Sequence, residues 1–348
     1  VLLGDFNLGV LWATLAGLIA GIVIGFTSDF FTSSDFFPVI NTAKVSSSGS
    51  AITIITGFSY GLISIVPSII GIALATLASY FLAEAAGISG IYGVGVSAVG
   101  LLSVSGMIVS ADAYGPIVDN ARGIAEMSGM SEDVIATADV LDSAGNTAKA
   151  ITKGFAISAA ALTVLALFAA YAEVIGMRGV ELLISLRNPM VIVGAFIGSM
   201  TPPLFSALTM LAVTDNAFKM IKEIRRQFKE SPGILAGTVE PDYAKCVGLA
   251  AEGALKSLLL PAFLAVIVPL LVGFILGPEA LGGFLGGSIL TGIVFALLMA
   301  NAGGLWDNAK KFIETGQFGG PGSEAHKAAV VGDTVGDPFK DTAGPSIN

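Results

Sequence analysis

Three aspartates near the end of the chain recur at the spacing of helical turns. In G-D-T-V-G-D-P-F-K-D (332–341), Asp333, Asp337 and Asp341 follow one another every four residues, and Lys340 precedes the last. A helix would place the three carboxylates on one face about 6 Å apart, where like charges repel. A divalent cation would remove that repulsion. An ordinary acidic first turn, favoured by the helix dipole, would not explain an aspartate two turns further in.

Three further segments place aspartates, lysines and an asparagine at helical spacing. Each alone has an ordinary explanation: solvated carboxylates at a helix end, a helical ion pair, or lysines that anchor a span on the cytoplasmic side. The segments are 111–121, 299–311 and 144–154, and they hold Asp112 and Asp119; Asp307, Lys310 and Lys311; and Asn146, Lys149 and Lys153.

Together these groups combine hard oxygen ligands with ammonium groups. Mg²⁺ usually binds through a few carboxylates and the phosphates of its substrate, and lysines hold polyanions as point charges. Cys246 and His326 are the only residues of their types, which excludes an intrachain disulfide and a thiolate zinc site. The pattern G-x-x-x-x-G-K-[ST] of phosphate-binding loops is absent from the sequence. The residues therefore predict a Mg²⁺–phosphate site without that nucleotide-binding loop.

The elements that position these groups must be helices in a membrane. Of 348 residues, 54% are hydrophobic and 12% are charged, against about 25% charged in soluble domains, and the mean hydropathy is +0.84. We expect an all-α, polytopic bundle of about eight transmembrane helices that forms one membrane domain over 1–348. Stretches long enough to span a bilayer lie near 10–30, 51–86, 89–111, 154–175, 190–213, 256–277 and 281–302, and an eighth begins after His326.

The basic residues indicate the orientation of these spans. If the N-terminus is outside and the spans alternate, 15 of the 17 lysines and arginines fall on one side, and only Arg178 and Arg187 on the other. Cytoplasmic loops carry the excess of basic residues, so the side that holds all four groups is predicted to be cytoplasmic. The net charge of −9 argues against a nucleic-acid partner, because phosphate backbones require a clustered excess of basic residues.

Six ordered segments resemble the membrane-bound, ion-pumping inorganic pyrophosphatases. The resemblance covers the whole chain and implies the last eight of sixteen helices, which form two concentric rings in each subunit of a homodimer. Because the chain begins with Val1 and its last predicted span is cut at Asn348, we expect it to be a fragment of a longer polypeptide. In chain order the segments are D-A-Y-G-P-I-V-D-N-A, G-N-T-A-K-A-I-T-K-G, G-S-M-T-P-P-L-F-S-A-L-T-M, E-P-D-Y-A-K-C-V, N-A-G-G-L-W-D-N-A-K-K and H-K-A-A-V-V-G-D-T-V-G-D-P-F-K-D-T.

The resemblance implies that pyrophosphate is hydrolysed at a cytoplasm-facing funnel of aspartates and lysines while H⁺ or Na⁺ is pumped outward. The expected location is the cell membrane of a prokaryote. Asp341 would be one of two carboxylates that position the attacking water. The other implied roles are Mg²⁺ binding by Asp119, Asp307, Asp333 and Asp337 with Asn146 close by, and binding of pyrophosphate oxygens by Lys310, Lys311 and Lys340.

Two positions in the G-N-T segment bear on the transported ion. Potassium-dependent members of this family tend to have alanine where this chain has Lys149, and often glycine where it has Thr152. A lysine ammonium can take the place of a bound K⁺. Since the potassium-independent members are proton pumps, the resemblance implies a K⁺-independent, H⁺-pumping enzyme.

The chain departs from the family pattern, and two alternatives remain open. Arg122 stands where the family usually has the first glycine of D-N-A-G-G. The family's other Asp- and Lys-rich motif, the second carboxylate for the water and the ion-gate lysine are not in this chain, so the chain alone is expected to be inactive. One alternative is a Na⁺-pumping pyrophosphatase. An alternative of another class is a non-hydrolytic transporter of a phosphate compound, for which an inverted repeat with broken helices would be typical.

Overall fold

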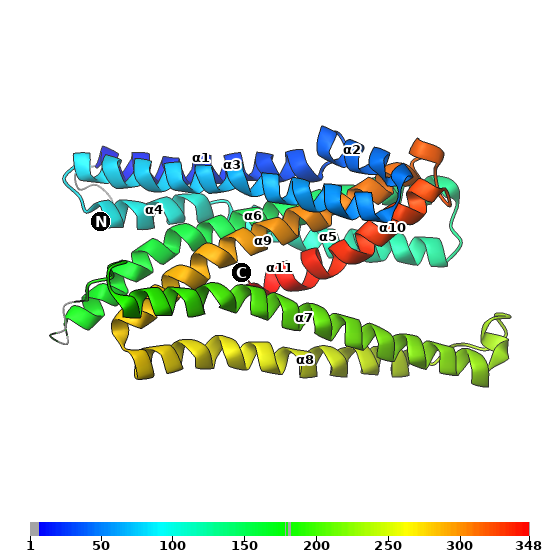
Figure 1. The fold of residues 1–348 in the computed structure, drawn as a ribbon. Coiled ribbons are helices and arrows are strands. Elements are labelled where there is room, and N and C mark those ends of the chain that lie inside the picture. Colours follow the sequence, from blue (N-terminus) through cyan, green and yellow to red (C-terminus); the bar gives the residue numbers. More distant parts are fainter. Residues whose placement is uncertain (1–6, 178, 180–181, 348) are drawn as a thin grey trace. The chain divides into compact units, whose positions relative to one another are not determined.

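The described residues form helices joined by short turns and loops, and they fold as two compact units. A computed structural model describes residues 7–177, 179 and 182–347, and every regular element within them is a helix. The first unit comprises 1–183 and 289–348, and the second comprises 184–288. The helices are labelled in Figure 1. Arg178, predicted on the outer side, lies outside the described residues. That 1–348 forms one membrane domain stays a prediction.

The predicted spans correspond to long helices. Among the described residues, six helices are long and apolar enough to cross a bilayer, and a pair bent by 49° provides up to one more. The expected all-α, polytopic architecture is therefore confirmed. The six contain α1 (Leu8–Thr32), α3 (Ser50–Ala85), α6 (Glu132–Gly176), α7 (Pro189–Glu230), α8 (Tyr243–Leu271) and α9 (Pro278–Glu314); the first continues beyond α1 to Ser48 and the fifth beyond α8 to Leu276. The bent pair is α4 (Gly90–Leu102) and α5 (Ser105–Met127).

Shorter helical segments join or follow these helices. The eighth predicted span corresponds to α10, η5 and α11, of which α10 has 14 residues, fewer than the about 20 that a full span requires. The short segments are α2 (Phe37–Val45), η1 (Ser46–Ser48), η2 (Pro232–Ile234), η3 (Val272–Leu276), η4 (Gln317–Gly319), α10 (Glu324–Asp337), η5 (Pro338–Ala343) and α11 (Gly344–Ile347).

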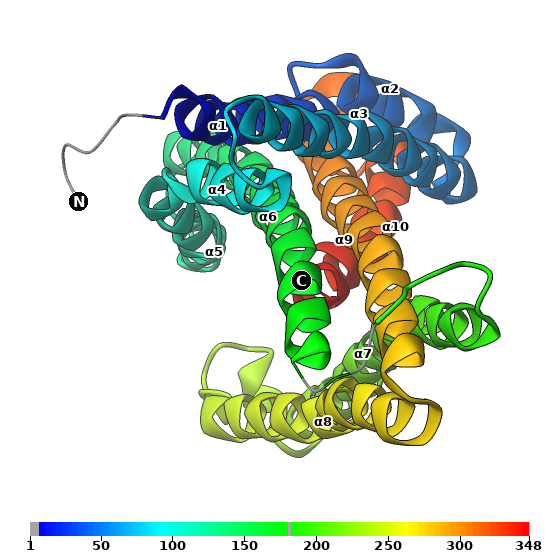
Figure 2. The same ribbon diagram turned by 90° about the vertical axis from the view of Figure 1, so that its left-hand side faces the viewer.

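In the first unit, small residues let the helices approach closely. Helix α1 packs against α3 and α4 (Figure 2). A Cβ added to Gly17 of α1 would lie 1.8 Å from the carbonyl oxygen of Ser97 in α4, and one added to Gly100 would lie 2.1 Å from that of Thr14. Close contact through glycine is typical of helices in lipid, where van der Waals packing drives association.

Helix α6 is much longer than the span predicted within it. Its 45 residues extend about 68 Å at 1.5 Å per residue, whereas the hydrocarbon core of a bilayer is about 30 Å thick. The helix begins after Ser131, and Glu132 and Asp133 in its first turn favour that end of the helix dipole. The polar half of α6, residues 132–153, therefore continues the span rather than forming a loop before it.

Trp306 of α9 is at the centre of the largest buried core of the first unit. It is 1% exposed, and its Nε1 donates to the carbonyl oxygen of Thr53 in α3 at 3.0 Å. Gly57 of α3 and Gly332 of α10 face the indole. A Cβ on Gly57 would lie 2.0 Å from an atom of the indole, and a Cβ on Gly332 would lie 3.1 Å from one. The tryptophan thereby joins α3, α9 and α10 immediately beside Asp307.

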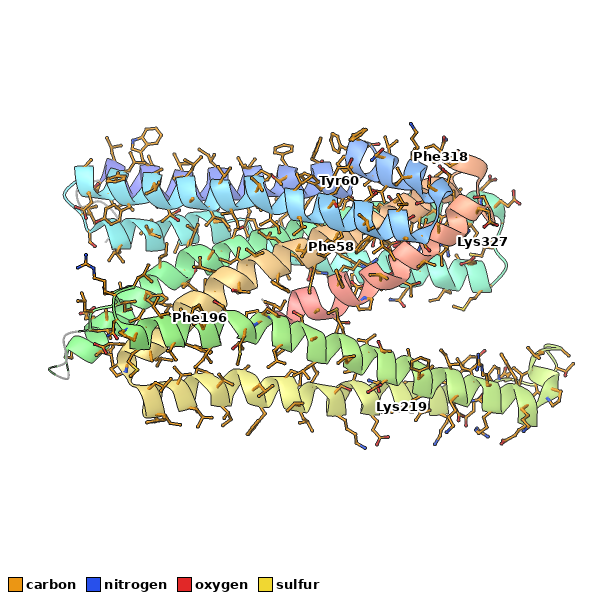
Figure 3. All side chains as sticks on the ribbon, in the orientation of Figure 1. Phe58, Tyr60, Phe196, Lys219, Phe318 and Lys327 are labelled. Carbon is orange, nitrogen blue, oxygen red and sulfur yellow. The ribbon has the colours of Figure 1, made fainter. Side chains whose placement is uncertain are left out.

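The second unit contains the helix pair α7 and α8, whose outer surfaces are apolar over much of their length. Phe196 of α7 is 72% exposed and Phe263 of α8 is 59% exposed, while Lys219 lies in the charged part of α7 (Figure 3). Exposed apolar side chains in such numbers fit helices that face lipid. Pro261 lies inside α8, as membrane helices tolerate.

Candidate active site

Five charged side chains meet where α9, α10 and η5 come together in the first unit. Asp307 and Lys310 are on α9, Asp333 and Asp337 are on α10, and Lys340 is in η5. Lys310 Nζ lies 3.2 Å from Asp307 Oδ1 and contacts Asp333. Lys340 Nζ lies 3.0 Å from Asp337 Oδ1 and contacts Asp307. These five predicted site residues form one group, the Asp–Lys cluster.

The aspartates of the cluster fit a divalent cation. One carboxylate oxygen from each of Asp307, Asp333 and Asp337 lies within 4.8 Å of the others. Asp307 and Asp333 are buried. Lys310 Nζ lies 3.2 Å from Asp307 Oδ1 and Lys340 Nζ lies 3.9 Å from Asp333 Oδ1, but neither oxygen accepts a hydrogen bond among the described residues. Buried carboxylate oxygens that accept no hydrogen bond are suited to a ligand. Oxygen donors without histidine or cysteine suit Mg²⁺.

The charges of the cluster also affect the ionisation of Asp333, which lies outside the candidate spans. Burial raises the pKa of Asp333 to about 6, and the charge on Asp307 adds to the rise, whereas Lys310 and Lys340 oppose it. A cation held beside Asp333 would favour its ionised form. The raised pKa therefore fits a group that receives a ligand of positive charge.

Two glycines allow α9 and α10 to come close enough to form the cluster. A Cβ on Gly303 would lie 2.7 Å from the carbonyl oxygen of Gly336, and one on Gly336 would lie 3.1 Å from Cα of Gly303. Gly303 precedes Asp307 by four residues, and Gly336 lies between Asp333 and Asp337. The two glycines thus lie within one helical turn of the carboxylates that the helix contact brings together.

Asp341 does not continue the stripe of Asp333 and Asp337, contrary to the helical spacing predicted from sequence. Helix α10 ends at Asp337, and residues Pro338–Ala343 form the π-helical segment η5. Pro338 has no N–H and so cannot make the α-helical bond to Thr334, which explains why the helix changes its winding here. The Asp341 side chain is 44% exposed and lies 3.9 Å from Lys153 Nζ, apart from the three carboxylates grouped in the cluster.

The backbone of Lys340 takes part in the site as well as its side chain. A π-helix pairs a carbonyl with the N–H five residues ahead, as Phe339 O does with Gly344 N–H in η5. The carbonyl of Lys340 would pair with residue 345, which is Pro345 and has no N–H. Lys153 of α6 donates its ammonium to this carbonyl instead. The proline thus explains how a backbone oxygen becomes free for a side chain from another helix.

Two predicted residues of α6 contact α5 rather than the Asp–Lys cluster. Lys149 is buried, and its Nζ lies 3.5 Å from Asp119 Oδ2. Thr152 Oγ1 donates to Asp112 Oδ1 at 2.9 Å. Asp119 is half-exposed and is not among the three carboxylates grouped closely enough for one ion. Its predicted metal role stays a prediction.

Asn146 and Lys311 have buried partners that the sequence analysis missed. Asn146 Nδ2 donates to Asn308 Oδ1 at 3.2 Å, and Lys311 Nζ lies 2.5 Å from Asp142 Oδ2. Asp142 precedes Asn146 by four residues and could have been found as the start of the α6 stripe. Asn308 directly follows Asp307 in W-D-N-A-K-K, but its spacing gave no sign that it faces α6.

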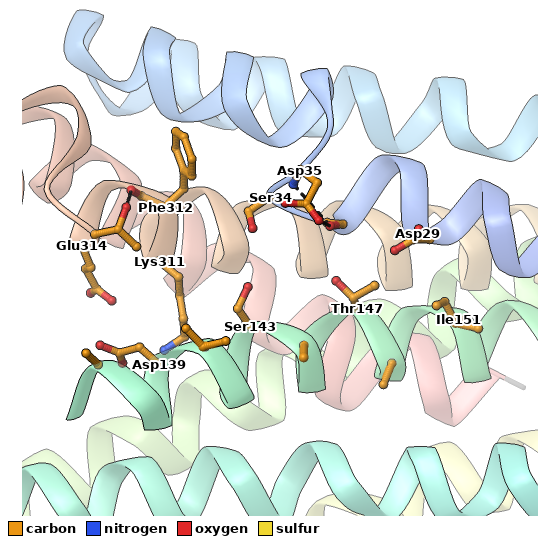
Figure 4. A pocket seen from close by; sticks show the side chains of 16 residues that line it. Asp29, Ser34, Asp35, Asp139, Ser143, Thr147, Ile151, Lys311, Phe312 and Glu314 are labelled. Carbon is orange, nitrogen blue, oxygen red and sulfur yellow. Dashed lines mark hydrogen bonds between the residues drawn. The ribbon is translucent and has the colours of Figure 1, made fainter. Parts of the chain in front are cut away.

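Lys311 also borders a cavity of about 700 Å³ in the first unit (Figure 4). The cavity is bounded by the end of α1 and the segment after it, the polar half of α6 and the end of α9. Asp29, Asp35, Asp139 and Glu314 supply carboxylates to its wall. Lys311 therefore lies on a different side of α9 from Lys310, although the two are adjacent in sequence.

Arg122, the departure from the family pattern, has carboxylate partners of its own. Its Nε lies 2.7 Å from Asp139 Oδ1 of α6, and its guanidinium also contacts Glu126 of α5. These contacts join the polar parts of α5 and α6. They also offset the positive charge that Arg122 brings to this segment.

The chain is similar to known proteins over nearly its whole length. The family model described as inorganic H⁺ pyrophosphatase matches residues 2–348. A protein of Methanosarcina mazei named K(+)-insensitive pyrophosphate-energized proton pump is 49% identical over 350 residues, which is 100% of this chain and 51% of that protein. A Clostridium tetani protein, provisionally named a K(+)-stimulated pyrophosphate-energized sodium pump, is 50% identical over 344 residues, 98% of this chain and 50% of that protein.

A third relative, from Caldanaerobacter subterraneus, is named K(+)-insensitive pyrophosphate-energized proton pump and is 47% identical over 345 residues, 97% of this chain and 48% of that protein. The chain thus spans about half the length of the curated relatives it matches. With its apolar spans, it is an integral membrane protein, as predicted. The chain belongs to the inorganic H⁺ pyrophosphatase family.

Proposed function

We propose that the chain supplies about half of a membrane-bound inorganic pyrophosphatase that hydrolyses Mg²⁺-pyrophosphate at a cytoplasm-facing site and pumps protons outward without requiring K⁺. The observation that carries this proposal is the Asp–Lys cluster, in which buried carboxylates lie against two lysines and keep oxygens that accept no hydrogen bond among the described residues. Asp307 and Lys310 lie within the candidate span Pro278–Glu314, and ionisable residues inside a transmembrane segment are rare and indicate a functional site by default. Family membership supplies the reaction class.

The cluster separates the groups for a cation from the groups for an anion. Asp307, Asp333 and Asp337 would hold Mg²⁺, which when bound would offset charge on the transferring phosphoryl group. Lys310 and Lys340 already lie in contact with these carboxylates. In the working enzyme their ammonium groups would exchange carboxylate partners for the oxygens of pyrophosphate, as point charges on a polyanion.

Asp341 is suited to a different step. Its carboxylate is exposed enough to contact water, and its Oδ1 lies 3.9 Å from Lys153 Nζ. An ionised carboxylate can accept a proton from the attacking water. We assign Asp341 this role, shared with a carboxylate outside this chain. Lys311 would bind substrate only by exchanging Asp142 for a phosphate oxygen.

Lys149 supports the K⁺-independent, proton-pumping form. Its buried ammonium lies 3.5 Å from Asp119 and supplies a fixed positive charge where a free cation would otherwise be needed. The second candidate function is Na⁺ pumping, which is favoured by the name of the Clostridium tetani relative at 50% identity. A non-hydrolytic transporter finds no such support among the relatives, whose names all state that pyrophosphate energises the pump.

The test uses the full-length protein that contains this chain, in sealed membrane vesicles. With Mg²⁺ and pyrophosphate, we expect phosphate release and acidification of the lumen without added Na⁺ or K⁺. Asp307→Asn should abolish both, while the matched control Glu252→Gln, an exposed partner of Lys256 on α8, should leave both unchanged. Activity that requires Na⁺ would indicate the sodium pump, and pyrophosphate uptake without phosphate release would indicate a transporter. Light scattering of the purified protein tests the proposed homodimer.

A further inference from the structure

Asn308 is the most extensively hydrogen-bonded side chain beside the Asp–Lys cluster. It follows Asp307 on α9 and is completely buried. Its Nδ2 lies 2.7 Å from the carbonyl oxygen of Thr32 and 3.2 Å from that of Ser143, and also 3.2 Å from Thr147 Oγ1. One amide group therefore joins α9 to the end of α1 and to α6.

The chemistry of these partners fixes the orientation of the Asn308 amide. Backbone carbonyls can only accept hydrogen bonds, so the NH₂ group of Asn308 must face Thr32 and Ser143. Its Oδ1 is then left for Asn146, and an oxygen can only accept. Asn146 must consequently present its own NH₂ group, at 3.2 Å.

The same reasoning fixes Asn146. Once its Nδ2 is committed to Asn308, its Oδ1 faces elsewhere. That oxygen is buried with no hydrogen-bond partner among the described residues, in a side chain that is 1% exposed. The reverse orientation would expose an NH₂ group, whose positive hydrogens repel a cation. The amide orientation therefore decides whether Asn146 can be a ligand at all.

We propose that Asn308 is a positioning residue that fixes the amide of Asn146 so that Oδ1 of Asn146 stays free to accept Mg²⁺ or a water bound to it. The proposal rests on the proposed function, and it takes Asn146 as the further member of the metal site that the family resemblance implies. Residues that orient metal ligands without touching the metal typically change metal affinity about 10–100-fold when substituted. A contact made only for stability would change the folding equilibrium instead.

The experiment measures Mg²⁺ binding without catalysis. Full-length protein in detergent is titrated with Mg²⁺ alone, and the Mg²⁺ concentration at the midpoint of the rise in Tm is recorded. The variants are Asn146→Ala, Asn308→Ala and the double variant. We expect each single substitution to raise the midpoint about 10-fold, and the double variant to match Asn146→Ala, because Asn308 acts through Asn146.

Asn301→Ala is the matched control. Asn301 is a buried asparagine on the same helix, and its Nδ2 donates to Ser64 of α3 at 2.9 Å. This variant should lower the Tm without moving the Mg²⁺ midpoint. If Asn308→Ala does not fold, Asn308→Ser takes its place with the same expectation, since its hydroxyl can still donate to one carbonyl but cannot hold the Asn146 amide.

The possible outcomes separate the two proposals. If Asn146→Ala raises the midpoint but Asn308→Ala does not, or if their effects multiply in the double variant, Asn308 has no positioning role and the metal site stands. If Asn146→Ala leaves the midpoint unchanged, Asn146 is not a ligand and both assignments fail. A shift caused equally by Asn301→Ala would show that loss of any buried asparagine is enough, which also overturns the proposal.

Discussion

At the scale of single residues, Asp337 and Asp341 have different surroundings although only four residues separate them. Asp337 belongs to the Asp–Lys cluster, whereas Asp341 lies 3.9 Å from Lys153 Nζ and its side chain is 44% exposed. In the full-length protein, Asp341→Asn should nearly abolish hydrolysis while Mg²⁺ binding changes little. Asp337→Asn should weaken Mg²⁺ binding as well. Turnover and the Mg²⁺ midpoint of Tm give both quantities, and near-normal turnover by Asp341→Asn at saturating Mg²⁺ would exclude its role with water.

The charge of Lys149 leads to a prediction about potassium. The unsubstituted enzyme should show no stimulation by K⁺, and Lys149→Ala should lower hydrolysis several-fold until K⁺ is added, because a free cation can then occupy the position of the ammonium. The control is Lys256→Ala, an exposed lysine on α8, which should not create a K⁺ requirement. If the unsubstituted enzyme needs K⁺ for full activity, Lys149 does not have this function.

The buried pair of Asp142 and Lys311 makes a prediction about stability. Asp142→Asn leaves the Lys311 ammonium buried without a counter-charge, which should lower the free energy of unfolding by about 3–5 kcal/mol. Replacing both residues, as Asp142→Leu with Lys311→Met, should recover most of that loss, because no unpaired charge remains. Unfolding monitored by tryptophan fluorescence compares the two variants. A double variant less stable than Asp142→Asn alone would contradict the expected cost of an unpaired charge.

The candidate site was predictable from sequence as far as α-helical spacing holds. Asp333 and Asp337 lie together as their spacing indicates, and Asp307 joins them through a contact between helices. Asp341 departs from the pattern because η5 winds differently from an α-helix. The partners of Asn146 and Lys311 come from other helices, and no local pattern reports which side of α9 faces α6.

At the scale of helices, hydropathy located the spans but not the helix ends. The polar half of α6 and the end of α7 are helical beyond the apolar stretches, because helix formation continues in water where side chains pair and pack. The stretch 89–111 reads as one span, yet α4 ends at Leu102 and α5 begins at Ser105 with a 49° bend. No proline marks this break in L-L-S-V-S-G, so spacing alone could not predict it.

The glycine contact between α9 and α10 can be tested by adding one methyl group. Gly303→Ala would place a Cβ 2.7 Å from the carbonyl oxygen of Gly336 and 2.6 Å from Cβ of Lys340. The helices must separate, so hydrolysis should fall at least 10-fold and stability by about 1–3 kcal/mol. Gly248→Ala on α8 has open space around it and should leave activity unchanged. Equal activity of the two variants would show that the cluster tolerates a wider helix separation.

At the scale of the whole molecule, the ends of α6 test the membrane orientation. Met130 and Met177 flank this helix and are 54% and 76% exposed. In a Cys246→Ser background, Met130→Cys should react with impermeant thiol reagents only from the cytoplasmic side, and Met177→Cys only from outside. The two positions control for each other, since both replace an exposed methionine. The reverse pattern would overturn the orientation inferred from basic residues.

Lys340 makes two separable contributions to the site, and the second of them depends on Pro345. Its ammonium is a charge in the Asp–Lys cluster, and its carbonyl oxygen accepts a hydrogen bond from Lys153 of α6. A substitution at 340 removes the first and leaves the second, because every amino acid carries a carbonyl. The second depends on residue 345 lacking an amide hydrogen. Pro345→Ala would return a donor to the helix and let it compete with Lys153 for the same oxygen. The contact between α6 and η5 therefore depends on a residue five positions after the one whose oxygen makes it.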